Sequence, residues 1–196
     1  MTITVEGCNT HPGFGKGKLI NSIKIAGDFL SRLPKDRLSP ETTEKREGFV
    51  HPYVVEASVE TTSVKFLIRD FVTAELKTKE AFLEQLAKAT VADWPGASVV
   101  CKVDESYRNM KEVLDKYPQV VENAREAVRR AGLELREAAI RGGTDGSRLS
   151  FMGLPTPNVF AGEHNFHSRL EWISVQDMEK AVEVIVNLAK VWEERA

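Results

Sequence analysis

The feature that most constrains the fold is the order of hydrophobic patterns in the first half of the chain. Alternating and helical periodicities predict strands at residues 2–8, 50–59, 63–72 and 98–107, and helices at residues 18–33 and 79–93. Thr78 is the expected N-cap of the second helix. The order strand, helix, strand, strand, helix, strand predicts a ferredoxin-like α+β domain over residues 1–107, in which two helices cover one face of an antiparallel sheet.

After residue 107 the pattern changes to amphipathic helices alternating with short strands. Helices are expected at residues 110–116, 120–131, 148–152 and 176–194, and strands at residues 135–140, 157–161 and 171–175. Thr144 is placed to cap the third of these helices. The pattern predicts a partial α/β segment, so residues 108–196 form a second domain with a thin sheet.

Composition excludes several classes of protein. The net charge of -2 and the scattered basic residues give no reason to expect nucleic-acid binding. No apolar run approaches the ~20 residues that span a bilayer, and no N-terminal signal pattern is present, so we expect a cytoplasmic protein without membrane contact. Cys8 and Cys101 are expected to be reduced, half-buried residues of strands.

The segment Arg141–His167 concentrates glycine, paired charge and imidazole, and it reads RGGTDGSRLSFMGLPTPNVFAGEHNFH. It resembles the signature of peptidase T, the tripeptide aminopeptidase of the co-catalytic zinc metallopeptidases. Further matches occur in HPG followed by KGK (His11–Lys18), EGF.H (Glu47–His51), IRDF (Ile68–Phe71) and Y.NM (Tyr107–Met110). The resemblance therefore covers essentially the whole chain, as a lid domain followed by the C-terminal part of a catalytic domain.

The resemblance implies roles for five residues, and three of them, His11, Arg69 and Asn109, also have a plainer alternative. His11 is implied to stabilise the oxyanion of the tetrahedral intermediate, although it could be an ordinary loop histidine. Arg69 and Arg141 are implied to bind the carboxylate end of the substrate, a task that suits the guanidinium group. Arg69, which lies in a predicted strand and precedes Asp70, could instead form a surface ion pair. Asn109 is implied to bind substrate or could cap a helix. His167 is implied to be a zinc ligand.

The metal site that the resemblance implies needs more ligands than this sequence provides. A catalytic zinc needs about three protein ligands, and a two-metal site needs bridging carboxylates. The related enzymes supply an H.D motif, a bridging Asp, a Glu-Glu pair and a further Asp from an N-terminal half, and no histidine of this chain begins an H.D motif. We therefore expect two zinc ions in the complete enzyme and no stable zinc binding by this chain alone.

The glycines and lysines of Gly13–Lys18, which reads GFGKGK, suggest a phosphate-binding loop. A phosphate-binding P-loop requires Ser or Thr after the lysine and a glycine five positions before Gly17, and this chain has Leu19 and Pro12 there. The spacing excludes a P-loop.

The sequence is compatible with two functions. The chain is expected to be an incomplete and inactive part of a zinc-dependent tripeptide aminopeptidase, with short peptides as ligands. Alternatively, it is a non-catalytic dimerisation or peptide-binding module derived from that family. In both cases, exposed strand edges and apolar helix faces predict self-association or association with the missing N-terminal half.

Overall fold

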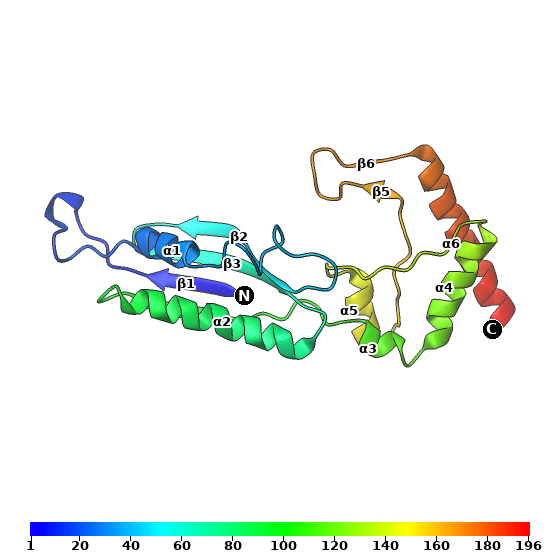
Figure 1. The fold of residues 1–196 in the computed structure, drawn as a ribbon, viewed down its shortest axis with the longest axis horizontal. Helices are drawn as coiled ribbons and strands as arrows, with labels where there is room; N and C mark the ends of the chain where they lie inside the picture. The colour runs from blue at the N-terminus through cyan, green and yellow to red at the C-terminus, as the bar shows by residue number, and fades with distance from the viewer. The chain divides into compact units, whose positions relative to one another are not determined.

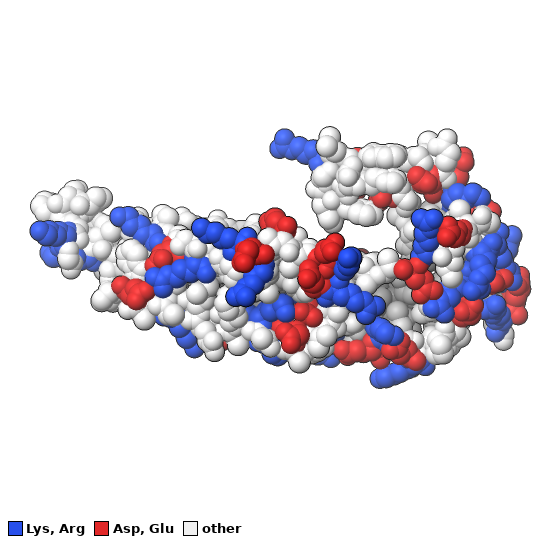
Figure 2. All heavy atoms as spheres, viewed as in Figure 1, with Lys and Arg blue, Asp and Glu red and all other residues white.

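The structure is a computed structural model that describes residues 1–196 (Figure 1). It divides into two compact units, Met1–Ser106 and Tyr107–Ala196. No helix is both long and apolar enough to cross a membrane. Lysine and arginine side chains are interspersed with acidic ones on the face shown in Figure 2.

The first unit contains one sheet and two long helices, and its elements follow in the predicted order. These are β1 (Thr2–Glu6), the 3-10 helix η1 (Pro12–Phe14), α1 (Ser22–Ser31), β2 (Phe49–Ala57), β3 (Thr61–Arg69), α2 (Thr73–Ala92) and β4 (Ser98–Lys102). The strands form a four-stranded sheet in the order β2-β3-β1-β4. Each neighbouring pair is antiparallel.

The core of the first unit lies on one face of this sheet. Side chains alternate across a strand, so Ile3 of β1 and Phe66 of β3 point to the same side, where both are fully buried. Phe29 of α1 packs edge to face against Phe66, with ring centroids 5.8 Å apart, and Leu83 of α2 completes the contact. The opposite face is more open, and Val100 of β4 is 56% exposed there. Both helices therefore cover the same face.

The two helices begin at different residues from those predicted. α1 begins at Ser22 rather than Lys18, because Ile20 pairs with Cys8 in a β-bridge and Asn21 caps the helix by accepting a bond from the Ile23 N–H. This bridge also leaves Cys8 exposed rather than half-buried in a strand.

α2 begins six residues before the predicted start. The hydroxyl of Thr78, the predicted N-cap, instead donates to the carbonyl of Ala74 inside the helix. Lys79 is buried and its Nζ lies 2.6 Å from Oδ2 of Asp70, whose Oδ1 accepts a bond from the Val72 N–H just before the helix. Gly48 makes room for this carboxylate, since a Cβ there would lie 2.0 Å from Asp70 Oδ2.

The second unit consists mainly of helices. Its elements are α3 (Lys111–Leu114), α4 (Pro118–Arg130), α5 (Asp145–Phe151), β5 (Glu163–His164), β6 (Trp172–Ile173) and α6 (Val175–Arg195). α4 and α6 pack against each other through Ala127, Ala131 and Val184, which are all buried. Arg130 on α4 and Glu194 on α6 form an ion pair of 2.7 Å at the edge of this contact.

The thin sheet predicted for residues 108–196 is mostly absent. Residues 135–140 and 157–161 are not strands, and the strand predicted at 171–175 is reduced to β6, which pairs antiparallel with β5 over two residues. The sequence predicted strands from local pattern, but a strand forms only where a neighbour accepts its hydrogen bonds, and these two segments have none. α5 does begin after Thr144, although the Thr144 hydroxyl makes no capping bond.

Candidate functional site

His11 lies in the loop that joins β1 to α1, at the start of η1. Its Nδ1 accepts a hydrogen bond of 3.1 Å from the Gly13 N–H, and its ring lies 5.3 Å from the ring of Phe14. Because Nδ1 is the acceptor, the proton of the neutral imidazole is on Nε2. The His11 side chain is exposed, so its Nε2–H is free to donate a hydrogen bond to a bound ligand. Stabilising an oxyanion, the role implied for His11, requires such a donor.

Arg69 is the last residue of β3. It is partly buried, and its Nη1 donates to the carbonyl of Ile68 at 3.4 Å. The next residue, Asp70, forms the buried ion pair with Lys79. The backbone that carries the guanidinium is therefore fixed by a strand on one side and by a buried ion pair on the other.

The structure does not bring His11 and Arg69 together within the first unit. In the antiparallel pairing of β1 with β3, Glu6 lies opposite Thr61, and Thr2 lies opposite Lys65. The loop with His11 follows the Glu6 end, shown in dark blue at the left of Figure 1, while Arg69 lies beyond the Thr2 end. The eight residue steps from Thr61 to Arg69 span about 27 Å, whereas an extended tripeptide spans about 10 Å. One tripeptide therefore cannot contact both residues of the same unit.

In the second unit, the segments with Asn109 and Arg141 are neighbours. Gly143 packs against the ring of Tyr107 so closely that a Cβ would come within 2.1 Å of it. The Ser147 hydroxyl donates to the carbonyl of Arg108. The RGGTDG turn thus lies against the Y.NM segment, as expected if the two motifs serve one site.

The geometry of Asn109 fits the plainer alternative at least as well as the functional one. Its Oδ1 accepts a bond of 3.1 Å from the Lys111 N–H, at the start of α3. This bond satisfies one of the free N–H groups at a helix N-terminus.

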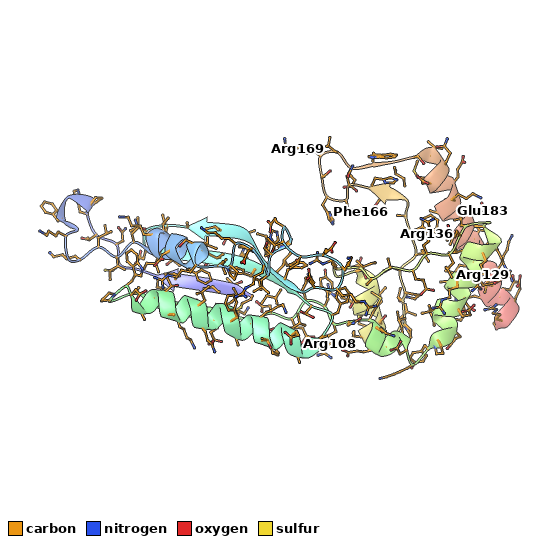
Figure 3. All side chains as sticks on the ribbon, viewed as in Figure 1. Arg108, Arg129, Arg136, Phe166, Arg169 and Glu183 are labelled. Atoms are coloured by element: carbon orange, nitrogen blue, oxygen red, sulfur yellow. The ribbon has the colours of Figure 1, made fainter.

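His167 lies in the loop between β5 and β6, where Figure 3 labels Phe166 and Arg169. His167 has φ 64° and Asn165 has φ 57°, so two residues other than glycine adopt the left-handed conformation. The carboxylate of Glu171 accepts a 2.8 Å bond from the His167 N–H, and this bond holds the loop in place. The His167 side chain is exposed.

Two residues outside the predicted set support this loop. The ring of His164 in β5 stacks on the indole of Trp172 in β6, with centroids 4.3 Å apart and an interplanar angle of 12°. The sequence contains no local signal for this contact, because it depends on the register of a two-residue ladder.

The residues present do not make a metal centre. No group of three or more His, Cys, Asp or Glu side chains is placed to hold a metal ion. His167 alone does not meet the requirement of about three protein ligands for a catalytic zinc. None of the five predicted site residues lines either of two adjoining pockets of the first unit, which share Pro34, Arg37 and Leu38.

Comparison with known proteins agrees with the resemblance seen in the sequence. Residues 1–95 match the peptidase dimerisation domain of the M20 peptidases. Over 193 residues, or 98% of its length, the chain is 45% identical to a peptidase T of Clostridium perfringens and covers 47% of that protein. It is 44% identical over 194 residues to a peptidase T of Geobacillus kaustophilus, again covering 47%. The chain thus spans about half the length of these relatives.

Solved structures show the same fold. A tripeptidase from Staphylococcus aureus can be superimposed on 97% of this chain with a TM-score of 0.70 and 18% sequence identity, and the match covers 50% of the tripeptidase. A dinuclear metal-binding peptidase of the M20 family from Bacillus subtilis can be superimposed on 100% of this chain with a TM-score of 0.58 and 18% sequence identity, and the match covers 50% of that peptidase. These solved structures share the fold of this chain, while the curated relatives show that 98% of the chain is homologous to about half of peptidase T, and residues 1–95 match a peptidase dimerisation domain.

Proposed function

We propose that this chain is the ferredoxin-like lid, residues 1–107, and part of the catalytic domain, residues 108–196, of a zinc-dependent tripeptide aminopeptidase. The observation that carries the proposal is 45% identity to a peptidase T across 98% of the chain. In the complete protein, the enzyme releases the N-terminal residue of a tripeptide. Ligands from outside this chain would hold the zinc together with His167, and the chain alone is inactive.

Four residues of the chain are assigned to the substrate. The Nε2–H of His11 donates to the oxygen that becomes negative when the peptide carbonyl is attacked. Arg69 and Arg141 bind the carboxylate end of the peptide, since a guanidinium can donate two parallel hydrogen bonds to a carboxylate. Asn109 orients the same end of the peptide from the segment that packs beside the RGGTDG turn.

Because His11 and Arg69 lie at opposite ends of one sheet, we propose that they act in different sites of a dimer. Each site then receives His11 from one copy and Arg69 from the other. Residues 1–95 match a peptidase dimerisation domain, and a domain of this kind would bring two copies of the chain together. A two-fold dimer contains two such composite sites.

A chimera tests the proposed function. The 193 residues of Clostridium perfringens peptidase T that align with this chain are replaced by the chain itself, and hydrolysis of trialanine is measured. We expect turnover, with loss on His167→Ala and a decrease in kcat of about 100-fold or more on His11→Ala. The control variant His51→Ala, at a histidine with no assigned role, retains turnover. A soluble, folded chimera without peptidase activity would contradict the proposal.

Mixing two inactive chimeras tests the composite site. A dimer of one His11→Ala copy and one Arg69→Ala copy has one site with both changes and one with neither. Random exchange of subunits should therefore restore about one quarter of the wild-type activity. No recovery despite exchange of subunits would mean that both residues act within one copy.

The second candidate is a non-catalytic dimerisation module. The observation that favours this candidate is that no three His, Cys, Asp or Glu side chains of residues 1–196 are placed to bind one metal ion. Under this hypothesis the isolated chain dimerises, while the chimera hydrolyses no tripeptide.

A further inference from the structure

The end of β3 that carries Arg69 is paired on one side only. β1 covers β3 as far as Thr2, which lies opposite Lys65, whereas the last three residues of β3 pair with β2 alone, with Phe49 opposite Arg69. A strand end with one neighbour opens more readily than the middle of a sheet, because fewer backbone hydrogen bonds hold it. The Arg69 side chain therefore keeps a fixed direction only if other contacts hold the backbone.

Gly48 supplies one of these contacts through its small size. A Cβ at this position would lie 2.7 Å from the carbonyl oxygen of Arg69 and would also overlap the carboxylate of Asp70. Gly48 does not have a positive φ, so the close approach, and not the backbone conformation, requires glycine here. The segment EGF.H, which has no role in the site described above, therefore packs directly against the segment IRDF.

The carboxylate of Asp70 supplies the second contact, and both of its oxygens have partners. Oδ1 accepts a 2.9 Å bond from the Val72 N–H, and Oδ2 accepts a 2.6 Å bond from Nζ of Lys79. Lys79 also lies 3.7 Å from Glu75, but the Glu75 side chain is 53% exposed, so Asp70 is the main partner of Lys79. Because Asp70 directly follows Arg69, a fixed Asp70 side chain also fixes the chain at Arg69.

Stability alone does not explain a buried ion pair at this place. Replacing such a pair by apolar residues of similar size is often neutral or stabilising. Bonds between a guanidinium and a carboxylate, in contrast, depend on orientation, because two N–H groups of one plane must meet two oxygens. Displacing a group that holds the substrate by about 1 Å can lower the rate about 100-fold. The contacts around Asp70 are therefore suited to fix the direction of Arg69.

We propose that Gly48, Asp70 and Lys79 are positioning residues for Arg69. They hold the end of β3 so that the guanidinium meets the carboxylate end of the substrate, and none of the three contacts the substrate itself. The proposal rests on the proposed function for the ligand of Arg69. The contacts that it uses lie wholly within Met1–Ser106.

The isolated chain tests the positioning without any enzymatic activity. The heteronuclear NOE of the Arg69 Nε–H measures how rigidly this side chain is held, and amide exchange of β1 shows whether the unit stays folded. We expect Gly48→Ala to lower this NOE while β1 stays protected. Gly27→Ala is the matched control, because a Cβ on Gly27 meets no atom within 4 Å, and it should leave the NOE unchanged. An unchanged NOE in Gly48→Ala, or an equal decrease in both variants, would overturn the proposal.

A second pair of variants covers the case in which Gly48→Ala does not fold. Lys79→Arg keeps a cation beside Asp70, whereas Lys79→Met removes it. At a temperature at which the β1 amides of both variants are protected, we expect Lys79→Met to lower the NOE of Arg69 and Lys79→Arg to keep it near the wild-type value. The same NOE in the two variants would count against positioning by Lys79 and overturn the proposal.

The chimera tests the consequence for the substrate. Trialanine has a C-terminal carboxylate and trialanine amide lacks it, so only trialanine depends on Arg69. The ratio of kcat/KM for the two substrates is independent of the fraction of folded enzyme, since both rates are proportional to it. We expect Gly48→Ala to lower this ratio at least about tenfold and Gly27→Ala to leave it within about twofold. An equal loss for both substrates would mean that these contacts only stabilise the fold.

The positioning and the proposed function fail separately. A chimera without peptidase activity would contradict the proposed function, while the NOE would still show whether Gly48 and Lys79 hold Arg69. An active chimera in which Gly48→Ala changes neither the NOE nor the substrate ratio would overturn the positioning and leave the proposed function in place.

Discussion

The two units bury their apolar residues to very different degrees. Of the fifteen apolar residues that are buried, eleven lie in Met1–Ser106 and four in Tyr107–Ala196. Of the twenty-four large apolar residues that are exposed, seven lie in the first unit and seventeen in the second. The first unit contains its own sheet and covers it with its own helices. The second has helices of similar length, but its only sheet is the two-residue ladder of β5 and β6, which is too small for these helices to cover, so their apolar faces stay open.

The units also differ in how they use charge. The first buries a single ion pair, Asp70–Lys79, with side chains 8% and 10% exposed. The second places its pairs on the surface of α4, where Arg125, Arg129 and Arg130 contact several glutamates. A buried pair is costly to break, whereas exposed pairs contribute little individually and are screened by salt.

The largest effect is expected from breaking the buried pair. Lys79→Met leaves the Asp70 carboxylate buried without its partner, which should lower the free energy of unfolding of the first unit by about 3–5 kcal/mol. Amide exchange of β1 and β3 measures this loss. Lys88→Met is the matched control, because Lys88 lies on the same helix in an exposed pair with Glu84 and should change stability by less than about 0.5 kcal/mol. Equal effects of the two variants would mean that the pair is not buried in solution.

The start of α2 shows where prediction from sequence reached its limit. Periodicity predicted the six elements of the first unit because each strand and helix there packs one face on a shared core. Periodicity placed the start of α2 six residues too late. The first turns of this helix, Thr73–Thr78, lie between Asp70 and Lys79, whose side chains form an ion pair. A contact between two side chains is not visible in a hydrophobic pattern.

In the second unit, hydrophobic periodicity identifies the helices well and the strands poorly. α4 and α6 were predicted nearly to their ends, since an amphipathic helix satisfies its own backbone hydrogen bonds. Residues 135–140 and 157–161 have strand-like patterns, but a strand needs a neighbour. Sequence motifs likewise selected His11 and Arg69 as site residues, whereas their separation along the sheet required the register of β1 and β3.

An intermediate effect is expected from the contact between α4 and α6. Val184→Ala removes two methyl groups from the buried cluster and should destabilise the helix pair by about 2 kcal/mol. Val182→Ala, two residues earlier on the same helix, should be nearly neutral in the isolated chain, because Val182 is 59% exposed. Hydrogen exchange of α6 amides distinguishes the two variants. If Val182→Ala were equally destabilising, Val182 would be buried in the isolated chain. The second unit would then not expose more apolar surface than the first, contrary to the comparison made above.

The smallest effect is expected from acid. Hydrogen bonds from Arg130 lower the pKa of Glu126 and of Glu194, and those from Arg129 and Arg125 lower the pKa of Glu122. A lowered pKa in the folded state stabilises the helix pair above the unfolded value of about 4.3, and this contribution is lost as the pH falls through the folded pKa.

The stability of the α4–α6 pair should therefore fall slightly below about pH 4.3, and 1 M salt at neutral pH should produce part of the same loss. The NMR signal of the Trp192 indole follows α6 during thermal unfolding at each pH. Arg130→Gln removes the partner of Glu194 and the nearer of the two arginine partners of Glu126, so it should reduce the acid sensitivity while lowering stability only slightly at pH 7. An unchanged pH profile in this variant would show that other carboxylates cause the loss, and that the surface pairs of the second unit do not hold its helices together.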